Sequence, residues 1–291
     1  MELLDGKKTS LEIQDELSKK VRSLVLNGLN PPHLVAVLVG NDGPSKTYVN
    51  AKVKACDRVG FKSTLHHLSS KVSEVEILKI IKELNEDDSV DGFIVQLPLP
   101  DHIDDNKITL AISPKKDVDG FHPENVGKMT LGIPAFLPAT PNGIMELLKR
   151  YKVPTEGKKT VVIGRSSIVG TPMSILMSRK SNPGNSTVTL AHSRTKNLDD
   201  LCKQADILIV AIGIPEFVTS NMVKPNAVVI DVGIHRIEDT SKKNGFRLIG
   251  DVNFSEVSSK CSYITPVPGG VGPMTIASLL MNTFIASNER N

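Results

Sequence analysis

The run LVAVLVG (Leu34–Gly40) constrains the fold more than any other segment of this sequence. It is a continuous apolar run rich in β-branched residues, so a strand formed from it carries apolar side chains on both faces. The turn-forming residues NDGPS end it. Strands that are buried on both faces are typical of parallel sheets covered by helices, so the sequence predicts an α/β fold.

Helical and strand patterns alternate through the first part of the chain. The segment Pro44–Gly60 follows the first strand directly and has helical periodicity. A short alternating strand is expected over residues 63–68, an amphipathic helix around residues 75–84, and a further strand over Gly92–Gln96. This order indicates a βαβαβ arrangement with a parallel sheet.

Two other segments of the first part carry weaker signals. Thr9 and Glu12 fit a capping box, and we expect them to begin an amphipathic N-terminal helix as the first element of the chain. Residues 97–127 are rich in turn-forming residues, so this stretch is expected to be mostly loop. A loop of that length inside a compact domain is more often functional than idle.

A second α/β series follows, and a glycine loop then leads into a C-terminal helix. Its expected strands occupy residues 160–164, 187–191, 206–213 and 227–234. We therefore expect two domains. The N-terminal domain comprises residues 1–139 and is completed by the C-terminal helix, residues 273–291, whereas residues 140–272 form a Rossmann-type domain.

Charge and cysteine content limit the class of function. Basic residues exceed acidic residues by only 3 and are scattered, so the sequence predicts no face that binds nucleic acid. The three cysteines show no CxxC spacing, which fits a reducing cytoplasm. No apolar run approaches the ~20 residues that span a bilayer, and the N-terminus lacks a signal-peptide pattern. We expect a soluble cytoplasmic protein that does not bind membranes.

A glycine turn follows the expected strand over residues 160–164. Gly164 and Gly170 lie six residues apart between a strand and a helix, in a G-x-S-x-x-x-G pattern. This arrangement suits a phosphate at the N-terminus of the helix, although a plain β–α turn explains the same glycines. Arg165 within the turn favours the anion site. No P-loop and no metal-binding motif occurs in the sequence.

Cations and hydroxyls follow the next strand, where an NAD site usually presents an acidic residue to the ribose. His192, Ser193 and Arg194 stand there and favour the 2′-phosphate of NADP, although exposed polar residues after a strand are an alternative interpretation. Ligands of open α/β sheets bind outside the carboxyl ends of the strands. The residues after later strands that should line this pocket are Gly213, Gly233 and Ile234.

The Pro44–Gly60 helix carries candidate chemistry on one side. Tyr48 and Lys52 are four residues apart and stack at the margin of its apolar stripe, whereas Lys46 and Lys54 lie opposite and are expected to be solvated. A lysine acts as acid or base near neutral pH only if burial or a neighbour lowers its pKa, and a cleft margin can supply that burial. A snorkelling side chain with its stem on apolar surface is the alternative.

Polar residues in two nearby segments can join this helix. Gln96 ends its strand at the carboxyl edge of the sheet, where its amide can hydrogen-bond Lys52 or a ligand. The KDVDGF turn places Asp117 and Asp119 two residues apart. One of them can stabilise the turn through its side chain, and the other can serve as a ligand carboxylate.

Five segments, in this order and spacing, resemble the bifunctional methylenetetrahydrofolate dehydrogenase/methenyltetrahydrofolate cyclohydrolase family: YVNAKVKAC, VQLPLP, KDVDGFHPENVG, VVIGRSSIVGTPM and ITPVPGGVGPMT. The resemblance covers nearly the whole chain. It implies oxidation of 5,10-methylenetetrahydrofolate with NADP and hydrolysis of the methenyl product to 10-formyltetrahydrofolate. Both reactions take place at one site between a folate domain and a Rossmann domain, and the family members are typically homodimers.

The resemblance also implies roles for individual residues. Lys52 corresponds to the catalytic lysine, Gln96 to its hydrogen-bonding partner, Asp119 to the pterin-binding aspartate and Tyr48 to the residue that stacks on the substrate. Further implied folate contacts are Val95, Leu97 and the loop formed by Pro268, Gly269, Gly270, Val271, Gly272, Pro273, Met274 and Thr275. The implied NADP contacts are Gly164, Arg165, Ser166, Ser193 and Ile234. Two alternatives stay open: an NADP-dependent dehydrogenase of another small substrate, and a catalytically silent folate- or nucleotide-binding protein.

Overall fold

A computed structural model describes residues 1–241 and 245–290 as two compact units. The first unit contains Met1–Ser10 and Thr140–Thr275, and the second contains Leu11–Ala139 together with the described residues from Ile276 onward. Helices α1 (Gly6–Leu26) and α10 (Val271–Arg290) contribute residues to both units. Each unit is described by itself.

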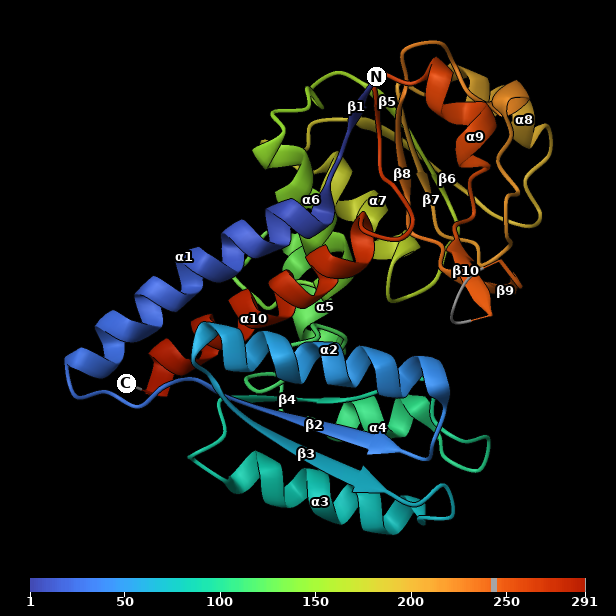
Figure 1. The fold of residues 1–291 in the computed structure, drawn as a ribbon. Coiled ribbons are helices and arrows are strands. Elements are labelled where there is room, and N and C mark those ends of the chain that lie inside the picture. The colour runs from blue at the N-terminus through green and yellow to red at the C-terminus, as the bar shows by residue number, and fades with distance from the viewer. Residues whose placement is uncertain (242–244, 291) are drawn as a thin grey trace. The chain divides into compact units, whose positions relative to one another are not determined.

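The second unit is built on a three-stranded parallel sheet in the order β3–β2–β4. Its strands are β2 (His33–Val39), β3 (Lys62–Leu68) and β4 (Gly92–Val95). All seven residues of β2 are buried, so the expected strand with two covered faces is confirmed. One face of this sheet is covered by α2 (Gly43–Val59) and the other by α3 (Glu74–Glu86) and α4 (Asp105–Ala111), as Figure 1 shows.

Alternate residues of β2 build the core on the α3 side of the sheet. Val35 and Val37 pack in one buried cluster with Ile77 and Ile81 of α3 and with Ile108 of α4. The i, i+4 spacing of the two α3 residues puts both on one helical face. Burying each such side chain contributes roughly 1.5–3 kcal/mol, so this cluster fixes α3 and α4 against the sheet.

Local signals set the ends of α2. The Asp42 carboxylate accepts the backbone N–H of Ser45 at 2.9 Å, and Pro44 occupies the first turn, where its missing N–H does no harm. Gly60 ends the helix with φ +83°, a left-handed conformation that favours glycine. The predicted helix is therefore confirmed to within one residue at each end.

The start of α1 differs from the prediction. A short strand, β1 (Glu2–Leu3), precedes it, and the helix begins at Gly6 rather than at Thr9. The Thr9 hydroxyl donates to the Asp5 carbonyl inside the first turn, whereas the Asp5 carboxylate accepts the N–H of Lys8. The cap is therefore Asp5, and the capping box predicted at Thr9 and Glu12 is wrong.

Residues 97–127 contain more regular structure than expected. They include all of α4 and the first residues of α5 (Pro123–Leu131). Asp104 caps α4 by accepting the N–H groups of Asn106 and Lys107, and His122 caps α5. Both helices are short and contain few apolar residues, so their periodicity is weak in the sequence.

The first unit contains a six-stranded sheet in the order β1–β11–β8–β7–β5–β6, with all of its strands parallel. Because β5 lies between β6 and β7, the strand order reverses beside β5. Its strands after β1 are β5 (Lys159–Ile163), β6 (Thr187–Ala191), β7 (Ile207–Val210), β8 (Val228–Asp231) and β11 (Tyr263–Ile264). The four strands that the sequence predicts in this part of the chain are confirmed.

Helices cover both faces of this sheet (Figure 1). One face is covered by α6 (Ala139–Arg150) and α7 (Gly170–Ser178), and the other by α8 (Leu198–Gln204) and α9 (Phe254–Val257), with the short turns η1 (Ser220–Met222) and η2 (Ser258–Lys260). A buried apolar cluster joins the α8 and α9 side to the strands. The expected α/β class is therefore confirmed.

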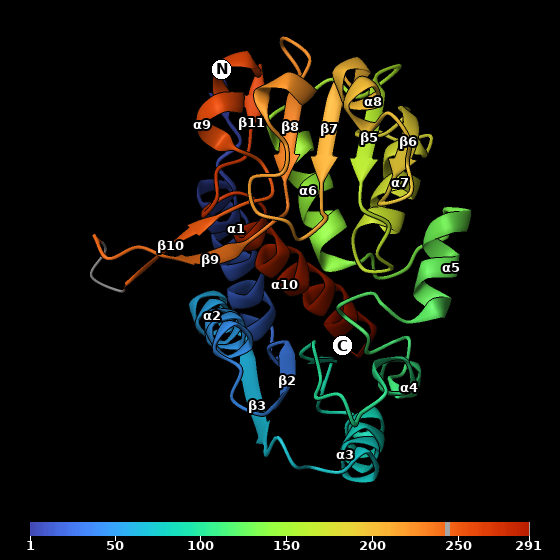
Figure 2. The same cartoon turned by 90° about the vertical axis from the view of Figure 1, so that its right-hand side faces the viewer.

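An antiparallel hairpin that the sequence analysis did not predict follows β8. Its strands β9 (His235–Glu238) and β10 (Phe246–Ile249) pair in register His235↔Ile249 to Glu238↔Phe246. Figure 2 shows these strands standing away from the parallel sheet. The chain then returns along β10 to the segment beside the end of β8, through Asp251.

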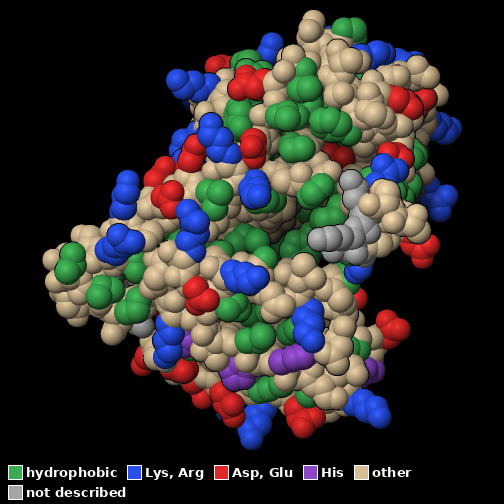
Figure 3. Space-filling model, in the orientation of Figure 1, with side chains coloured by type: hydrophobic (Ala, Val, Ile, Leu, Met, Phe, Trp, Pro, Cys, Tyr) green, Lys and Arg blue, Asp and Glu red, His purple; other side chains and the backbone are tan. Residues whose placement is uncertain are grey.

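Both signs of charge occur on the surface of the protein. On the face shown in Figure 3, Lys and Arg side chains are interspersed with Asp and Glu. Among the described residues, no helix has the length and apolar character needed to cross a membrane.

Candidate functional site

Lys52 is buried in the second unit, with a relative exposure of 7%. Its Nζ atom donates a hydrogen bond to Oε1 of Gln96 at 3.1 Å. The Gln96 amide is oriented by a second hydrogen bond, because its Nε2 atom donates to the carbonyl of Leu97 at 2.7 Å. Helix α2 and the end of strand β4 thus place a lysine against a neutral acceptor, as one of the sequence interpretations predicts.

The other polar residues of α2 differ in solvent exposure, as expected. Lys46 and Lys54 are exposed, whereas Tyr48 is half-buried one turn before Lys52. Burial raises the pKa of the Tyr48 phenol. Its hydroxyl forms no hydrogen bond with the residues that the structure describes, so Tyr48 presents an aromatic ring beside the lysine rather than a structural hydrogen bond.

The two aspartates of the KDVDGF turn have different environments. Asp117 is buried, and its carboxylate accepts hydrogen bonds from the N–H groups of Gly120 and His122 and from the Asn125 side chain. In contrast, no group in the described part of the chain donates to the Asp119 carboxylate. Asp117 therefore stabilises the turn, and Asp119 has its hydrogen-bonding capacity free for a ligand.

Electrostatics also distinguish Asp119. Burial of its carboxyl raises the pKa of Asp119, the nearby charge of Lys52 acts in the opposite direction, and Asp117 adds to the rise. Burial is the largest of these effects. Asp119 and Lys52 are thus close enough to influence each other, and the fold brings the predicted residues of α2, β4 and the KDVDGF turn into one neighbourhood.

An asparagine side chain and a close glycine contact hold the turn that carries Asp119. The side-chain amide of Asn282, on α10, donates to the carbonyls of Val118 and Leu137 at 2.8 and 3.0 Å. Gly120 has φ +74°, and a Cβ atom there would lie 2.5 Å from the Leu137 carbonyl carbon. A residue larger than glycine therefore cannot occupy position 120 without moving the turn.

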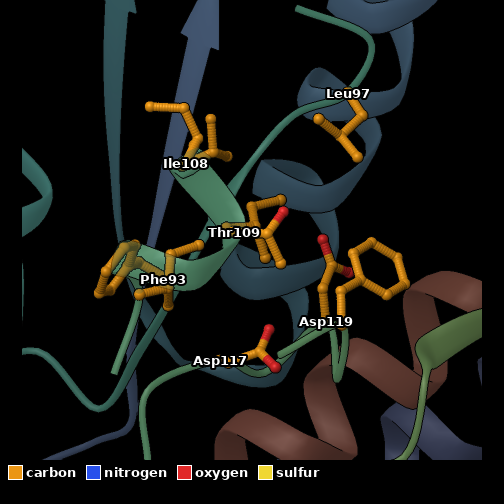
Figure 4. Close-up of a pocket in the computed structure, with 10 residues that line it drawn as sticks. Phe93, Leu97, Ile108, Thr109, Asp117 and Asp119 are labelled. Atoms are coloured by element: carbon orange, nitrogen blue, oxygen red, sulfur yellow. The ribbon is translucent and has the colours of Figure 1, made fainter. Parts of the chain in front are cut away.

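A narrow pocket lies beside this turn (Figure 4). Figure 4 shows Asp117 and Asp119 on a loop at one border, with Ile108 and Thr109 of α4 facing them and Phe93 beside them. Of the residues predicted to contact folate, Val95, Leu97 and Asp119 line it, whereas Tyr48, Lys52 and Gln96 do not. Asp117, the other aspartate that the sequence singles out, also lines it, and the lining residues missed from the sequence are Phe93, Ile94, Ile108, Thr109, Ile112 and Phe121.

The glycine turn of the first unit is closed by two backbone contacts. Gly164 has φ +112°, and a Cβ atom there would lie 2.0 Å from the carbonyl oxygen of Ala211. A Cβ atom on Gly170 would lie 1.9 Å from the carbonyl oxygen of Gly164. Only glycine fits either position, and this packing brings the N-terminus of α7 against the end of β5.

A cavity of about 210 Å³ opens at the carboxyl ends of β5, β7 and β8. This is the side of β5 on which the strand order reverses, where α/β sheets bind dinucleotides. The residues that line the cavity are Ser166, Val169, Ala211, Gly213, Val232, Gly233, Ile234, His235 and Asp251. The structure thus brings Ser166, Ile234 and the two predicted glycines of the later strands together.

The remaining predicted cofactor contacts do not line this cavity. Gly164 shapes it indirectly through its contact with Ala211. Arg165 is exposed in the glycine turn, and Ser193 is exposed after β6. Because β5 and β6 are adjacent and parallel, both side chains follow strands at the same edge of the sheet as the cavity.

The segment Pro268–Thr275 is only partly the loop that the sequence predicts. Helix α10 begins at Val271, so the loop comprises Pro268, Gly269 and Gly270. Gly269 has φ +106°, and its carbonyl accepts the N–H of Lys7. These residues belong to the first unit, whereas Lys52 and Asp119 belong to the second.

A pair of buried aspartates at the cavity was missed by the sequence analysis. Asp251 lines the cavity and is fully buried, and Asp231 supports it from the end of β8. Burial raises the pKa of Asp231 to about 6, although backbone N–H groups, including that of Val252, act against the rise. Asp231 is the last residue of β8 and Asp251 follows β10, and a lone Asp near a strand end is a common turn signal, so the sequence alone did not single out either residue.

Fold and site together define a dinucleotide-dependent α/β enzyme. The open parallel sheet supplies a glycine turn and a cavity at the point where its strand order reverses. The second unit supplies a buried lysine with a neutral partner and a carboxylate available to a ligand.

Both parts of the chain match the same family of known proteins. Residues 4–119 match the catalytic domain of the tetrahydrofolate dehydrogenase/cyclohydrolase family, and residues 138–291 match its NAD(P)-binding domain. The bifunctional protein FolD of Cytophaga hutchinsonii is 64% identical over 287 residues, which cover 99% of each chain. The chain belongs to the tetrahydrofolate dehydrogenase/cyclohydrolase family, as the sequence motifs indicate.

Solved structures agree with this assignment. The bifunctional FolD enzyme of Campylobacter jejuni, a methylenetetrahydrofolate dehydrogenase/cyclohydrolase, has 49% sequence identity and a TM-score of 0.92, with 99% of both chains covered. The Trypanosoma brucei FolD enzyme, solved with NADP cofactor and inhibitor, has 37% identity and a TM-score of 0.92, covering 98% of this chain and 96% of its own.

Proposed function

We propose that the protein oxidises 5,10-methylenetetrahydrofolate to 5,10-methenyltetrahydrofolate with NADP and hydrolyses this product to 10-formyltetrahydrofolate, as an enzyme of one-carbon metabolism. The observation that carries the proposal is the buried Lys52–Gln96 hydrogen bond beside the Asp119 carboxylate, to which no described residue donates. Membership of the family supports both reactions.

Asp119 is proposed to bind the pterin. The aminopyrimidinone edge of a pterin presents two adjacent N–H donors, and a carboxylate can accept both as a bidentate pair. The Asp119 carboxylate makes no competing bond within the described residues, in contrast to the saturated Asp117. Tyr48 is proposed to offer its aromatic face to the ring system of the substrate.

Lys52 is proposed to move the protons of the hydrolysis. Water adds to the carbon between N5 and N10, one C–N bond breaks, and the products are the formyl group, a new N–H and one released proton. Lys52 accepts a proton from the water as the C–O bond forms and donates one to the departing nitrogen. Gln96 holds the amine in place without adding a charge.

The oxidation depends on the cofactor that the first unit is proposed to bind. A nicotinamide ring takes up the hydride from the methylene carbon, which is the chemistry that the cofactor supplies. The contacts proposed for it are Gly164, Arg165, Ser166, Ser193 and Ile234. Ser166 and Ile234 line the cavity, and Arg165 and Ser193 supply the cation and hydroxyl that favour a 2′-phosphate, hence NADP.

The proposal extends to the organisation of the protein. The proposed folate domain comprises residues 1–139 with 273–291, although Met1–Ser10 and residues 273–275 cluster with the other compact unit. Residues 140–272 form the proposed NADP domain, and Pro268–Thr275 are proposed to contribute to folate binding. The protein works in the cytoplasm as a homodimer. Size-exclusion chromatography with light scattering tests the dimer, and a monomer at working concentration would contradict that part of the proposal.

A steady-state assay tests the function. The purified protein is mixed with 5,10-methylenetetrahydrofolate and NADP, and the formation of NADPH and of 10-formyltetrahydrofolate is followed. Both products are expected. A folded protein that forms neither contradicts the proposal, and faster turnover with NAD than with NADP contradicts the choice of cofactor.

A further inference from the structure

A histidine–aspartate pair borders the cavity of the first unit and has no role in the function proposed above. The Nε2 atom of His235 donates to Oδ1 of Asp251 at 2.7 Å. The Asp251 side chain is 0% exposed and that of His235 is 19% exposed, and both residues line the cavity. Within the described residues, the imidazole ring makes no other hydrogen bond.

Asp251 connects this histidine to the end of β7. Its second oxygen, Oδ2, accepts the backbone N–H groups of Ile212 and Gly213 at 2.8 and 3.0 Å. Three donors thus satisfy a fully buried carboxylate, as burial of such a group requires. Because Gly213 lines the cavity, the position of this wall depends on the orientation of the Asp251 side chain.

The same carboxylate also supports the segment that follows β8. A Cβ atom on Gly233 would lie 2.3 Å from Oδ1 of Asp251, so the backbone packs directly on that oxygen. Asp231 reinforces the contact, because its Oδ1 accepts the N–H groups of Gly233 and Asp251 at 2.9 Å each. The segment after β7 therefore binds Oδ2 of Asp251, and the segment after β8 packs on Oδ1. His235 donates to Oδ1.

We propose that His235 is a positioning residue for the nicotinamide cofactor: by donating to Asp251 it holds the segments after β7 and β8 in the arrangement that binds the cofactor. The inference rests on the proposed function, since it takes the cavity to be the cofactor site. Without this donor, Oδ1 of the buried carboxylate has no hydrogen-bond partner, and only the N–H groups of Ile212 and Gly213 orient the Asp251 side chain.

Two substitutions test the hydrogen-bond donor and the size of the ring separately. His235→Gln keeps an N–H donor at a similar distance from the backbone, whereas His235→Phe keeps a ring of similar size without a donor. Isothermal titration calorimetry of the full-length protein with NADP, in the absence of folate, measures binding directly. The phenylalanine variant is expected to bind NADP about 5- to 150-fold more weakly, the loss that follows from an unpaired buried acceptor, and the glutamine variant within roughly threefold of the native protein.

Controls distinguish positioning from general damage. Glu238→Gln changes an exposed residue of the same strand and is expected to leave NADP affinity unchanged. Thermal melts establish that each variant is folded, and His235→Ala replaces the phenylalanine variant if that side chain does not fit. In the dehydrogenase assay, the KM for NADP should rise with the dissociation constant, while kcat at saturating NADP stays within roughly twofold.

The outcomes are separable. A native protein that does not bind NADP overturns the proposed function itself. If the native protein binds and the donor-free variants bind equally well, only the positioning role of His235 is overturned. The same holds if His235→Gln loses as much affinity as His235→Phe, or if kcat at saturating NADP falls as much as the affinity.

Discussion

The Nζ atom of Lys52 and the Oε1 atom of Gln96 are 3.1 Å apart, and this hydrogen bond joins the middle of α2 to the end of β4. The partner of the buried lysine is uncharged. The Gln96 amide orients the amine of Lys52 through this bond and adds no charge beside it. The geometry therefore suits the proton transfers of the proposed hydrolysis.

Gln96→Glu should slow the hydrolysis of methenyltetrahydrofolate. The added carboxylate puts a negative charge against Nζ of Lys52 and opposes proton transfer by this group, so the rate near neutral pH should fall at least about tenfold. The kcat for the hydrolysis, measured at saturating substrate, checks this. Gln204→Glu adds the same charge on the exposed surface of α8 and should have no effect. A Gln96→Glu enzyme with native turnover contradicts the assignment.

Asp119→Asn should weaken folate binding. A charge-assisted hydrogen bond contributes about 1.5–3 kcal/mol, so the KM for methylenetetrahydrofolate should rise roughly 10- to 150-fold. The affinity for NADP, measured by calorimetry, should not change. An unaltered KM for the folate substrate would show that another group binds the pterin.

The same substitution should stabilise the protein at neutral pH. Burial raises the pKa of Asp119 above its usual 3.8, so the folded state binds this proton more tightly than the unfolded state. The stability that this carboxyl contributes is complete below about pH 3.8 and is lost as the pH rises through the raised pKa, so its ionised form destabilises the fold at pH 7. Denaturant unfolding at pH 7 should therefore show a more stable Asp119→Asn variant.

Asp117→Asn is the matched control for that measurement. Asp117 accepts hydrogen bonds from Gly120, His122 and Asn125, and an asparagine at this position replaces an acceptor oxygen by an NH₂ group. Its variant should be less stable than the native protein by about 1–3 kcal/mol. Equal effects of the two substitutions would contradict the different roles assigned to the two aspartates.

Gly170→Ala should disrupt the glycine turn. The added Cβ atom would lie 1.9 Å from the Gly164 carbonyl oxygen, so α7 must move away from the end of β5. NADP binding, measured by calorimetry, should be lost or strongly weakened. Gly127→Ala is the control, because its Cβ atom meets nothing within 4 Å inside α5, and it should stabilise the protein by up to about 1 kcal/mol. NADP binding by Gly170→Ala equal to that of the native protein would contradict the proposed turn geometry.

The elements with strong patterns could be predicted from the sequence. The buried run of β2 and the proline and glycine that bound α2 are local signals, and the structure follows them. The start of α1 could not be predicted, because Asp5 and Thr9 both fit a cap, and the pairing of β1 with β11, about 260 residues away in the chain, is not a local property. Short α4 and the β9–β10 hairpin likewise depend on tertiary packing.

Some residues of the candidate site could likewise be predicted from the sequence, and others could not. Lys52 and Tyr48 could be recognised from helical spacing together with the motifs, and Gln96 from the end of its strand. Which aspartate of the KDVDGF turn is available to a ligand could not be predicted, because it depends on Asn125 and on backbone N–H groups that the fold brings to Asp117. The link between His235 and Asp251 spans 16 residues and a hairpin that no local pattern indicated.

Hydrolysis by a Lys52→Met variant tests the central claim most directly. Methionine keeps much of the apolar stem of the lysine but has no proton to exchange, and it leaves Gln96 and Asp119 in place. Conversion of methenyltetrahydrofolate to 10-formyltetrahydrofolate, measured against the native enzyme at saturating substrate, should fall by about 10²–10⁴-fold, the usual contribution of a general acid–base group. Full cyclohydrolase turnover by a folded Lys52→Met protein would contradict the role assigned to Lys52.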